Sequence, residues 1–231
     1  MSYSDWIQPK PRKDVILNLR KDIQRLRKNN LLDNVRDIFV GSVTDSYQPL
    51  ELEQKLTRQI LEVLIENELP FTILTKSNLV LRDIDLLKGY KLCRAGITLT
   101  SLDESFRKEL EPGATEYSKR IEVLPMLKAN GIATYLSCEP IMPVKEANPL
   151  PIVQKLRDVV DLFEFGMWSK YRYRHIPKYY WSNDSDEFYY DTFLAIIKFC
   201  EVENINYCLA SHSKDFIEFY NLPFKPHPLI K

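Results

Sequence analysis

Polar residues suited to binding a charged or polar ligand follow several short apolar segments of this 231-residue chain. The candidates for such a binding site are Ser42, Thr44, Lys76, Thr98, Thr100 and Glu139. Lys76 is the sharpest of them, because a lysine ammonium binds a carboxylate or a phosphate as a point charge. A single polar residue in such a place usually caps a helix or forms a turn, as Ser101 and Glu104 would in a capping box. Because such polar residues recur after several successive apolar segments, we favour a binding site over caps and turns alone.

The other residues that often carry chemistry have no suitable spacing. The histidines are isolated and are expected to be structural or solvated: His175, His212 and His227. The cysteines are widely spaced, mostly in apolar segments, and are expected to be reduced, buried thiols: Cys93, Cys138, Cys200 and Cys208. The sequence contains no glycine-rich phosphate loop and no G-x-S-x-G nucleophile motif. We therefore expect no metal site formed by this chain.

Alternating strand and helix patterns place the polar residues at one edge of a sheet. Short apolar segments predict strands at 37–43, 71–75, 94–99, 133–138, 162–166 and 205–209. Helical patterns occur at 14–29, 51–67, 79–87, 118–130, 151–160 and 187–203. This alternation is typical of a parallel α/β sheet or barrel, in which ligands bind at the C-terminal ends of the strands. Pro125 lies inside the helix at 118–130 and is expected to kink it.

Composition limits the class of protein. Hydrophobic residues make up 45% of the chain and charged residues 28%, which excludes a disordered chain. The 32 basic and 32 acidic residues balance, so no overall charge attracts nucleic acid or a membrane. The N-terminus lacks a signal-peptide pattern, and no segment approaches the roughly 20 apolar residues that span a bilayer. We expect one domain over residues 1–231, irregular at 1–13, in a cytoplasmic protein without membrane contact.

Several motifs resemble one family, in the same order along the chain. They are 42–51 (SVTDSYQPLE), 56–58 (LTR), 73–77 (ILTKS), 81–87 (LRDIDLL), 98–103 (TLTSLD), 110–114 (LEPGA), Arg120 and 137–140 (SCEP). These motifs cover about residues 35–145 and resemble radical S-adenosylmethionine (SAM) proteins of the spore photoproduct lyase-like group. The resemblance implies a partial (β/α)6 TIM-type barrel that binds SAM across the tops of its strands.

The resemblance also implies which residues hold SAM. Ser42 and Thr44 are expected to hold its amino group, and Lys76 its carboxylate. The nucleoside end is assigned to later strands, with Thr98 or Thr100 near the ribose and Glu139 near the adenine. SAM is therefore the cofactor that the resemblance implies for this chain.

The chain departs from this family at the iron–sulfur cluster. The family binds a [4Fe-4S] cluster through three cysteines spaced C-x-x-x-C-x-x-C after its first barrel strand, whereas no cysteine precedes Cys93 here. The first strand and the cluster loop are therefore expected to be absent from this chain. The cluster would have to come from a missing N-terminal segment or from a cluster-bearing partner chain.

Functions of two classes are consistent with these observations. The chain is expected to be the C-terminal part of a radical SAM enzyme whose cluster-binding segment lies elsewhere, and to bind SAM only weakly by itself. The alternative is a non-catalytic relative that binds a ligand or a partner through the retained barrel. A third interpretation, which rests on fewer residues, is an ordinary barrel enzyme that uses Lys76 and Glu139 on a small anion.

Two further features bear on partners. Aromatic and basic residues alternate from Trp168 to Trp181, a pattern that can hold single-stranded nucleic acid by stacking and charge. An acidic stretch follows at once, so a hydrophobic lid over the barrel mouth is favoured over nucleic-acid binding. A missing first strand would leave the strand at 37–43 with an unpaired edge, and such an edge favours a partner or self-association.

Overall fold

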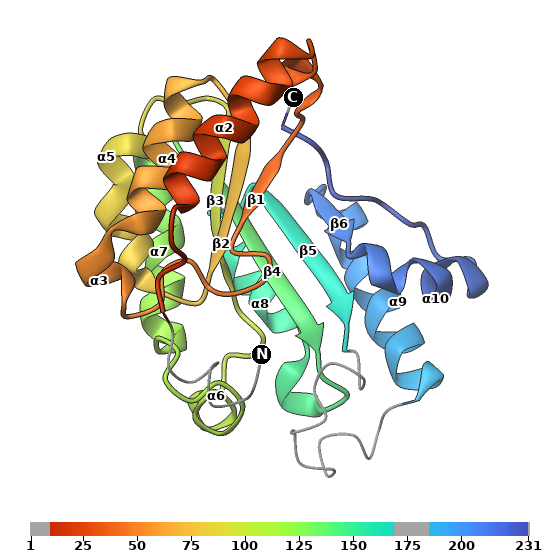
Figure 1. The fold of residues 1–231 in the computed structure, drawn as a ribbon. Helices are drawn as coiled ribbons and strands as arrows, with labels where there is room; N and C mark the ends of the chain where they lie inside the picture. The colour runs from red at the N-terminus through yellow and green to blue at the C-terminus, as the bar shows by residue number, and fades with distance from the viewer. Residues whose placement is uncertain (1–9, 169–184, 231) are drawn as a thin grey trace.

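The computed structural model describes residues 10–168 and 185–230, which form an open parallel sheet covered by helices (Figure 1). Six strands pair in the order β1-β2-β3-β4-β5-β6, and every neighbouring pair is parallel. The strands are β1 Ile38–Val40, β2 Phe71–Thr75, β3 Cys93–Thr98, β4 Ala133–Ile141, β5 Leu162–Met167 and β6 Tyr207–Leu209. β1 and β6 lie at the two edges of this sheet. The predicted partial barrel is therefore confirmed.

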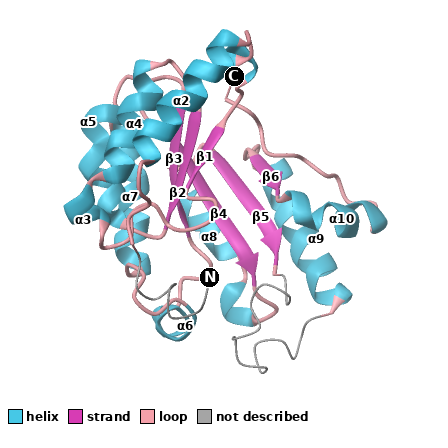
Figure 2. Cartoon of the chain, viewed as in Figure 1, coloured by secondary structure: helices cyan, strands magenta, loops and turns pink. Residues whose placement is uncertain are grey.

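Helices connect the successive strands, and one further helix lies before β1 and one after β6 (Figure 2). They are α2 Val15–Lys28, α3 Glu51–Gln54, α4 Leu56–Glu66, α5 Ile84–Leu87, α6 Glu104–Leu110, α7 Tyr117–Ala129, α8 Leu150–Leu156, α9 Asp186–Val202 and α10 Lys214–Phe219. The helices predicted at 14–29, 118–130 and 187–203 are confirmed as α2, α7 and α9. Within residues 10–168 and 185–230, no helix combines the length and the apolar character needed to cross a membrane.

Several element boundaries differ from the sequence predictions. The helix expected at 51–67 is broken into α3 and α4, because Lys55 adopts a left-handed backbone conformation with a φ of 48°. The segment expected as a helix at 79–87 begins as a 3₁₀ helix over Asn78–Asp83, and only α5 is α-helical. β1 ends before Gly41, whose φ of 102° turns the chain out of the sheet. Two of these departures lie where a single residue, Lys55 or Gly41, adopts a positive φ.

The predicted capping box of Ser101 and Glu104 is wrong. α6 is capped by Asp103, whose Oδ1 accepts a hydrogen bond from the Ser105 amide at 2.8 Å. Ser101 is buried instead, and its hydroxyl donates to the carbonyl of Glu146 at 2.5 Å. Glu104 pairs with Arg107 through a contact between Oε2 and Nε. The sequence has the residue types of a capping box, but Ser101 binds the Glu146 carbonyl, and Glu104 binds Arg107 and the Tyr117 amide.

Side chains of the sheet alternate between two faces, as parallel strands require. One face packs against the helices. Its side chains in the main core are Phe71, Ile73, Ile97, Leu136, Phe163 and Phe165. The opposite face, which we call the inner face, carries a smaller cluster of Tyr135, Leu162 and Cys208, with Phe39 and Leu74 packed on it. The inner face is the side on which ligands of a barrel bind, so it sets where the site residues must point.

The segment after α10, which we call the C-terminal tail (residues 220–230), contacts β6 and β3 of the sheet. The Leu209 amide donates to the carbonyl of Lys225 at 2.7 Å, which joins the tail to β6. Further along, Arg94 Nη2 donates to the carbonyl of Pro228 at 2.7 Å, which joins the tail to β3. The tail therefore runs from α10 past β6 and toward the N-terminal ends of the strands, where the C-terminus lies in Figure 1.

Candidate functional site

Lys76 directly follows β2, and Asp45 from the loop after β1 holds the backbone at this point. Asp45 Oδ2 accepts a hydrogen bond from the Lys76 amide at 2.7 Å, and Asp45 Oδ1 accepts one from the Thr75 hydroxyl at 2.6 Å. This carboxylate therefore fastens the β1 loop to the C-terminal end of β2. Ser42 and Thr44 belong to the same loop, so they lie on a segment that is tied to Lys76.

Glu111 engages the ammonium group of Lys76. Lys76 Nζ lies 3.5 Å from Glu111 Oε1, with the lysine side chain 37% exposed and the glutamate side chain 11% exposed. The Thr100 hydroxyl donates to the same carboxylate oxygen at 3.3 Å. Glu111 comes from the connection between α6 and α7, whereas Thr100 follows β3. The fold thus brings a cation from the connection after β2 together with a carboxylate and a hydroxyl from the connection after β3.

Arg120 of α7 holds the second oxygen of Glu111. Arg120 Nη2 lies 2.7 Å from Glu111 Oε2, and the arginine side chain is completely buried. Its Nε donates to the carbonyl of Thr115 at 2.7 Å, and Nη1 donates to the carbonyl of Thr98 at 3.1 Å. A buried guanidinium is tolerated only when its charge is paired, and here the Glu111 carboxylate supplies the opposite charge while two carbonyls accept from Nε and Nη1. Arg120 therefore fixes Glu111 relative to the end of β3.

Tyr117 completes the polar group at this end of the sheet. Its hydroxyl lies 2.9 Å from the Thr100 hydroxyl, and its ring lies 5.0 Å from Cζ of Arg120. Burial and the negative charge of Glu111 hold the pKa of Tyr117 above its usual range. The Tyr117 hydroxyl therefore keeps its proton at neutral pH. Two cations, one carboxylate and two neutral hydroxyls therefore lie close together at this end of the sheet.

The predicted residues on β3 and β4 lie along the same edge of the sheet. Thr98 and Thr100 are buried, and Thr98 is in parallel register with Ser137 of β4. A Cβ added to Gly166 of β5 would lie 2.9 Å from Cγ of Glu139, so Glu139 fills the space that this glycine leaves. Glu139 Oε1 also lies 3.7 Å from Nδ1 of His212. Glu139 and Lys76 thus have different ion-pair partners, which gives the small-anion interpretation no support.

The loop after β1 presents Ser42 and Thr44 to solvent. Val43 between them is 92% exposed, which is unusual for a large apolar side chain. The structure therefore divides the predicted residues into three groups. Lys76, Thr98 and Thr100 belong to the network around Glu111, Glu139 lies beside β5, and Ser42 and Thr44 lie on an exposed loop tied to Lys76.

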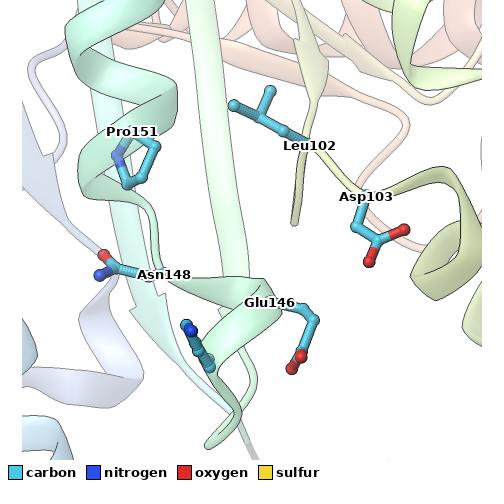
Figure 3. Close-up of a pocket in the computed structure, with 6 residues that line it drawn as sticks. Leu102, Asp103, Glu146, Asn148 and Pro151 are labelled. Carbon is cyan, nitrogen blue, oxygen red and sulfur yellow. The ribbon is translucent and has the colours of Figure 1, made fainter.

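A pocket of about 380 Å³ lies beside this site, between the connection after β3 and the connection after β4 (Figure 3). Its lining residues are Leu102, Asp103, Lys145, Glu146, Asn148 and Pro151. None of the six predicted site residues lines this pocket. Ser101 connects it to the site, because the Ser101 hydroxyl binds the carbonyl of Glu146 and Ser101 follows Thr100 directly.

The cysteines of the chain do not suit an iron–sulfur cluster. All four are buried and free, and they lie in separate elements: Cys93, Cys138, Cys200 and Cys208. An iron–sulfur cluster needs its cysteine ligands close together, and these cysteines come from β3, β4, α9 and β6. The sequence also lacks three closely spaced cysteines. The residues present therefore do not fit a [4Fe-4S] cluster, although the Lys76 network fits a charged, polar cofactor such as SAM.

Comparison with known proteins identifies the family. A model of the radical SAM superfamily matches residues 3–149, which is more than half of the chain. The chain therefore belongs to the radical SAM superfamily, and the predicted family is confirmed. The matched range includes every predicted site residue, from Ser42 to Glu139.

Two curated relatives also match the chain in part. An uncharacterized protein of Methanocaldococcus jannaschii is 39% identical over 122 residues, which cover 50% of this chain and 47% of that protein. An uncharacterized protein of Acidianus two-tailed virus is 33% identical over 129 residues, which cover 54% of this chain and 42% of that protein. The matched stretch thus spans less than half the length of each relative.

Solved structures of radical SAM enzymes share the fold. SuiB of Streptococcus suis bound to S-adenosylmethionine is 14% identical with a TM-score of 0.64, over 88% of this chain and 45% of SuiB. A mutant spore photoproduct lyase with bound AdoMet and dinucleoside spore photoproduct is 16% identical with a TM-score of 0.52. The second match covers 71% of this chain and 51% of the lyase. At these identities the likeness establishes the fold alone.

Sequence reasoning missed Glu111 and Arg120 as site residues. Both lie in motifs that carry the family resemblance, and that position is the only sequence signal that could have selected them. The aromatic and basic tract from Trp168 to Trp181, considered for nucleic acid, lies outside the described residues except for Trp168. Trp168 is buried and packs with Phe106, Met142 and Ala147.

Proposed function

We propose that this chain binds SAM at the C-terminal ends of its strands and serves as the C-terminal part of a radical SAM enzyme. The cysteines for the [4Fe-4S] cluster would then come from a separate segment or a partner chain. Membership of the radical SAM superfamily supports the cofactor. The observation that carries the proposal is the pairing of Lys76 with Glu111 at 3.5 Å, because it offers adjacent opposite charges at the expected place.

The two charges suit the amino-acid end of SAM, which carries a carboxylate and an ammonium group. Lys76 would bind the carboxylate, and Glu111 would accept the ammonium in place of its present contact with Lys76. Arg120 keeps Glu111 in position on its other oxygen, at 2.7 Å. Glu111 thus takes over part of the role that the resemblance assigns to Ser42 and Thr44, whose loop would close over the same end of the ligand.

The nucleoside end of SAM would extend along the sheet from β3 toward β4. Thr98 or Thr100 would meet the ribose, and Glu139 would meet the adenine. SAM bound beside a reduced cluster would supply the radical chemistry of the superfamily. In this proposal the named residues of this chain bind and orient the cofactor.

Iron reconstitution tests the cluster part of the proposal. The purified chain, treated anaerobically with iron and sulfide, is expected to give no absorption of a four-iron cluster, because its cysteines are buried and dispersed. A chromatographically stable cluster with a four-iron spectrum would contradict the assignment of the ligands to another segment. Counting the reactive thiols of the native chain is a second test. Reactive cysteines would contradict the statement that all four cysteines are buried.

The alternative function is a non-catalytic relative that binds a ligand or a partner through the barrel. The unsuitable cysteines favour it, because without a cluster no electron reaches SAM. The DNA upstream of the coding region separates the two proposals. A C-x-x-x-C-x-x-C motif there, in frame or after a frameshift, supports the enzyme, and its absence supports the non-catalytic relative.

A further inference from the structure

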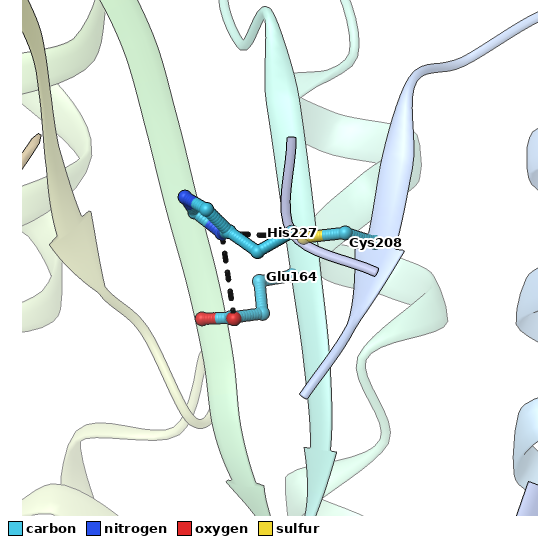
Figure 4. Close-up of side chains that lie close together, drawn as sticks. All are labelled: Glu164, Cys208 and His227. Carbon is cyan, nitrogen blue, oxygen red and sulfur yellow. Dashed lines mark hydrogen bonds and ion pairs between the residues drawn. The ribbon is translucent and has the colours of Figure 1, made fainter. Parts of the chain in front are cut away.

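A second group of chemically active side chains lies on the inner face and includes none of the six residues proposed to hold SAM. Glu164 of β5, Cys208 of β6 and His227 of the C-terminal tail converge there, as Figure 4 shows. His227 Nδ1 lies 3.7 Å from Cys208 Sγ and 3.7 Å from Glu164 Oε1. Parallel register places Glu164 beside Cys208, and the tail adds the histidine from the opposite side.

The distances between these atoms match the edges of a tetrahedral metal site. Zinc binds sulfur at about 2.3 Å and nitrogen or oxygen at about 2.0–2.2 Å, so its ligand atoms are separated by roughly 3.4–3.6 Å. The three candidate ligand atoms all lie within 4.8 Å of one another, and two of the separations are 3.7 Å. The two contacts of His227 would contract by a few tenths of an ångström around one ion, and the separation between Cys208 and Glu164, which is within 4.8 Å, would contract by up to roughly one ångström.

The other ring nitrogen of His227 is placed as in many metal-binding histidines. His227 Nε2 lies 3.8 Å from Asp37 Oδ2, at the start of β1. That carboxylate oxygen accepts a hydrogen bond from the Thr72 hydroxyl at 2.9 Å and lies 3.5 Å from Arg94 Nη2. A carboxylate on the outer nitrogen fixes the ring orientation and makes the inner nitrogen a better ligand. Asp37 would supply this support.

Glu164 is also held in an orientation that suits a ligand. The Tyr135 hydroxyl donates to Glu164 Oε2, which leaves Oε1 directed toward His227. The Glu164 side chain is only 12% exposed, so its charge needs a cation or donors nearby. A Cys208 thiolate and the Glu164 carboxylate together carry two negative charges, which one divalent cation would neutralise.

Two polar atoms of this group remain unsatisfied. Within the described residues, His227 Nε2 and Asp37 Oδ1 are buried without a hydrogen-bond partner. Buried polar atoms of this kind are rare and call for an explanation such as an ion or a water molecule. A metal on Nδ1 would draw His227 toward β5 and β6 and fix Nε2 as the protonated nitrogen that faces Asp37.

We propose that Glu164, Cys208 and His227 bind one Zn²⁺ ion, with water in the fourth position. The mixed sulfur, nitrogen and oxygen donors suit zinc better than the hard cations magnesium or calcium. The ion would clasp the C-terminal tail to β5 and β6. We assign it a structural role, because it would join the tail to the sheet and its three ligands are not among the residues proposed to hold SAM.

Zinc titration of the metal-free chain tests the proposal. We expect one Zn²⁺ per chain, measured by competition with a chromophoric chelator, and about a 100-fold or greater loss of affinity in Cys208→Ala and His227→Gln. The matched controls are Cys200→Ala, which removes another fully buried thiol, and His212→Gln, which removes a histidine near Glu139. The controls should bind zinc like the parent chain. Equal affinity in His227→Gln and the parent would overturn the proposal.

Cobalt supplies a second readout that does not depend on affinity. Co²⁺ bound by a thiolate shows an intense sulfur-to-cobalt absorption band, which we expect in the parent chain and in Cys200→Ala but not in Cys208→Ala. The cysteine variant could fail to fold, so Glu164→Gln, a variant of equal size, is measured as well. It should bind Co²⁺ more weakly, while its far-ultraviolet circular dichroism stays unchanged. Folded protein with no thiolate band would overturn the site.

Hydrogen exchange at the contact between the C-terminal tail and β6 tests whether zinc clasps the tail to the sheet. The Leu209 amide bonds to the carbonyl of Lys225, so zinc should slow its exchange in the parent chain. His227→Gln should abolish this effect of zinc. A slowing of equal size in His227→Gln would show that zinc acts elsewhere and would contradict the clasp.

Discussion

The ammonium of Lys76 lies 3.5 Å from the carboxylate of Glu111, although the two residues belong to connections after different strands. Glu111 in turn is anchored by Arg120, which is completely buried. This chain of charges leads from the exposed end of β2 into the core beside α7. It couples the proposed cofactor site to the stability of the fold, because the same carboxylate serves both.

Replacing Arg120 with methionine should strongly destabilise the protein. The substitution removes a buried guanidinium that binds Glu111 and the carbonyls of Thr98 and Thr115. Breaking one half of a buried ion pair costs about 3–5 kcal/mol, which urea denaturation would measure. Lys119→Ala is the control, because Lys119 pairs with Glu116 on the exposed side of the same helix and should cost less than about 1 kcal/mol. Equal losses in the two variants would contradict the anchoring role.

Asp161 should make stability depend on pH in the acidic range. Partial burial would raise the pKa of Asp161, but hydrogen bonds from Lys128 and Thr134 outweigh it and hold the pKa below 3.8. A lowered folded pKa means that the stabilisation is complete above the unfolded pKa of about 3.9 and is lost as pH falls through the folded value. Asp161→Asn should therefore destabilise the protein at pH 7 by about 1–2 kcal/mol through weakened hydrogen bonds.

The difference in unfolding free energy between the parent and Asp161→Asn should shrink as pH falls below about 4. Urea denaturation at a series of pH values would measure it. Asp158→Asn, which changes an exposed aspartate three residues earlier, serves as the control and should change stability little at any pH. A difference that stays constant down to pH 2, or grows, would rule out this account of Asp161.

Pro125→Ala should stabilise the chain. Pro125 lies inside α7 on an exposed face, where it removes a backbone donor from the helix. Alanine restores the donor and relieves the clash of the proline ring with the preceding turn, for a gain of about 1–3 kcal/mol. Thermal or urea unfolding would measure the gain, with the exposed neighbour Met126→Ala as a control expected near zero. A loss of stability in Pro125→Ala would show that the proline has a packing role.

The unpaired edge of β1 should promote association. β1 has only three residues, pairs with β2 alone among the described strands, and leads into a loop in which Val43 is 92% exposed. Such an edge offers free backbone groups to another strand. We expect light scattering to show self-association, or a co-purifying partner, that Phe39→Pro disrupts. A monodisperse monomer with slow hydrogen exchange along β1 would contradict this expectation.

Local patterns in the sequence were sufficient to predict the strands and most helices, but not the contacts between residues of different elements. The segments at 71–75 and 162–166 form strands because buried apolar runs of that length suit a parallel sheet. The pairing of Lys76 with Glu111 depends on how α6 packs, and α6 itself is not among the predicted helices. Periodicity carries no information on such contacts, since they join residues of different elements.

The same reason explains why the group around His227 escaped the sequence analysis. His227 is isolated in the sequence, but the C-terminal tail brings it to Glu164 and Cys208 across the inner face. Its path depends on hydrogen bonds such as that from Arg94 to the carbonyl of Pro228, which no local pattern encodes. One signal was available: Glu164 is a charged residue within the apolar strand 162–166, where an acidic side chain requires a partner.

Calorimetry with SAM tests the central claim most directly, because it asks whether Lys76 holds the amino-acid end of the cofactor. We predict weak binding to the parent chain, since the cluster iron is missing, and about a tenfold or greater further loss in Lys76→Ala, which corresponds to about 1.4 kcal/mol. Lys88→Ala, an exposed lysine before β3, should bind SAM like the parent. Methylthioadenosine, which lacks the amino-acid end, should bind the parent and Lys76→Ala equally. Tight SAM binding without iron, or SAM binding that Lys76→Ala leaves unchanged, would contradict the account.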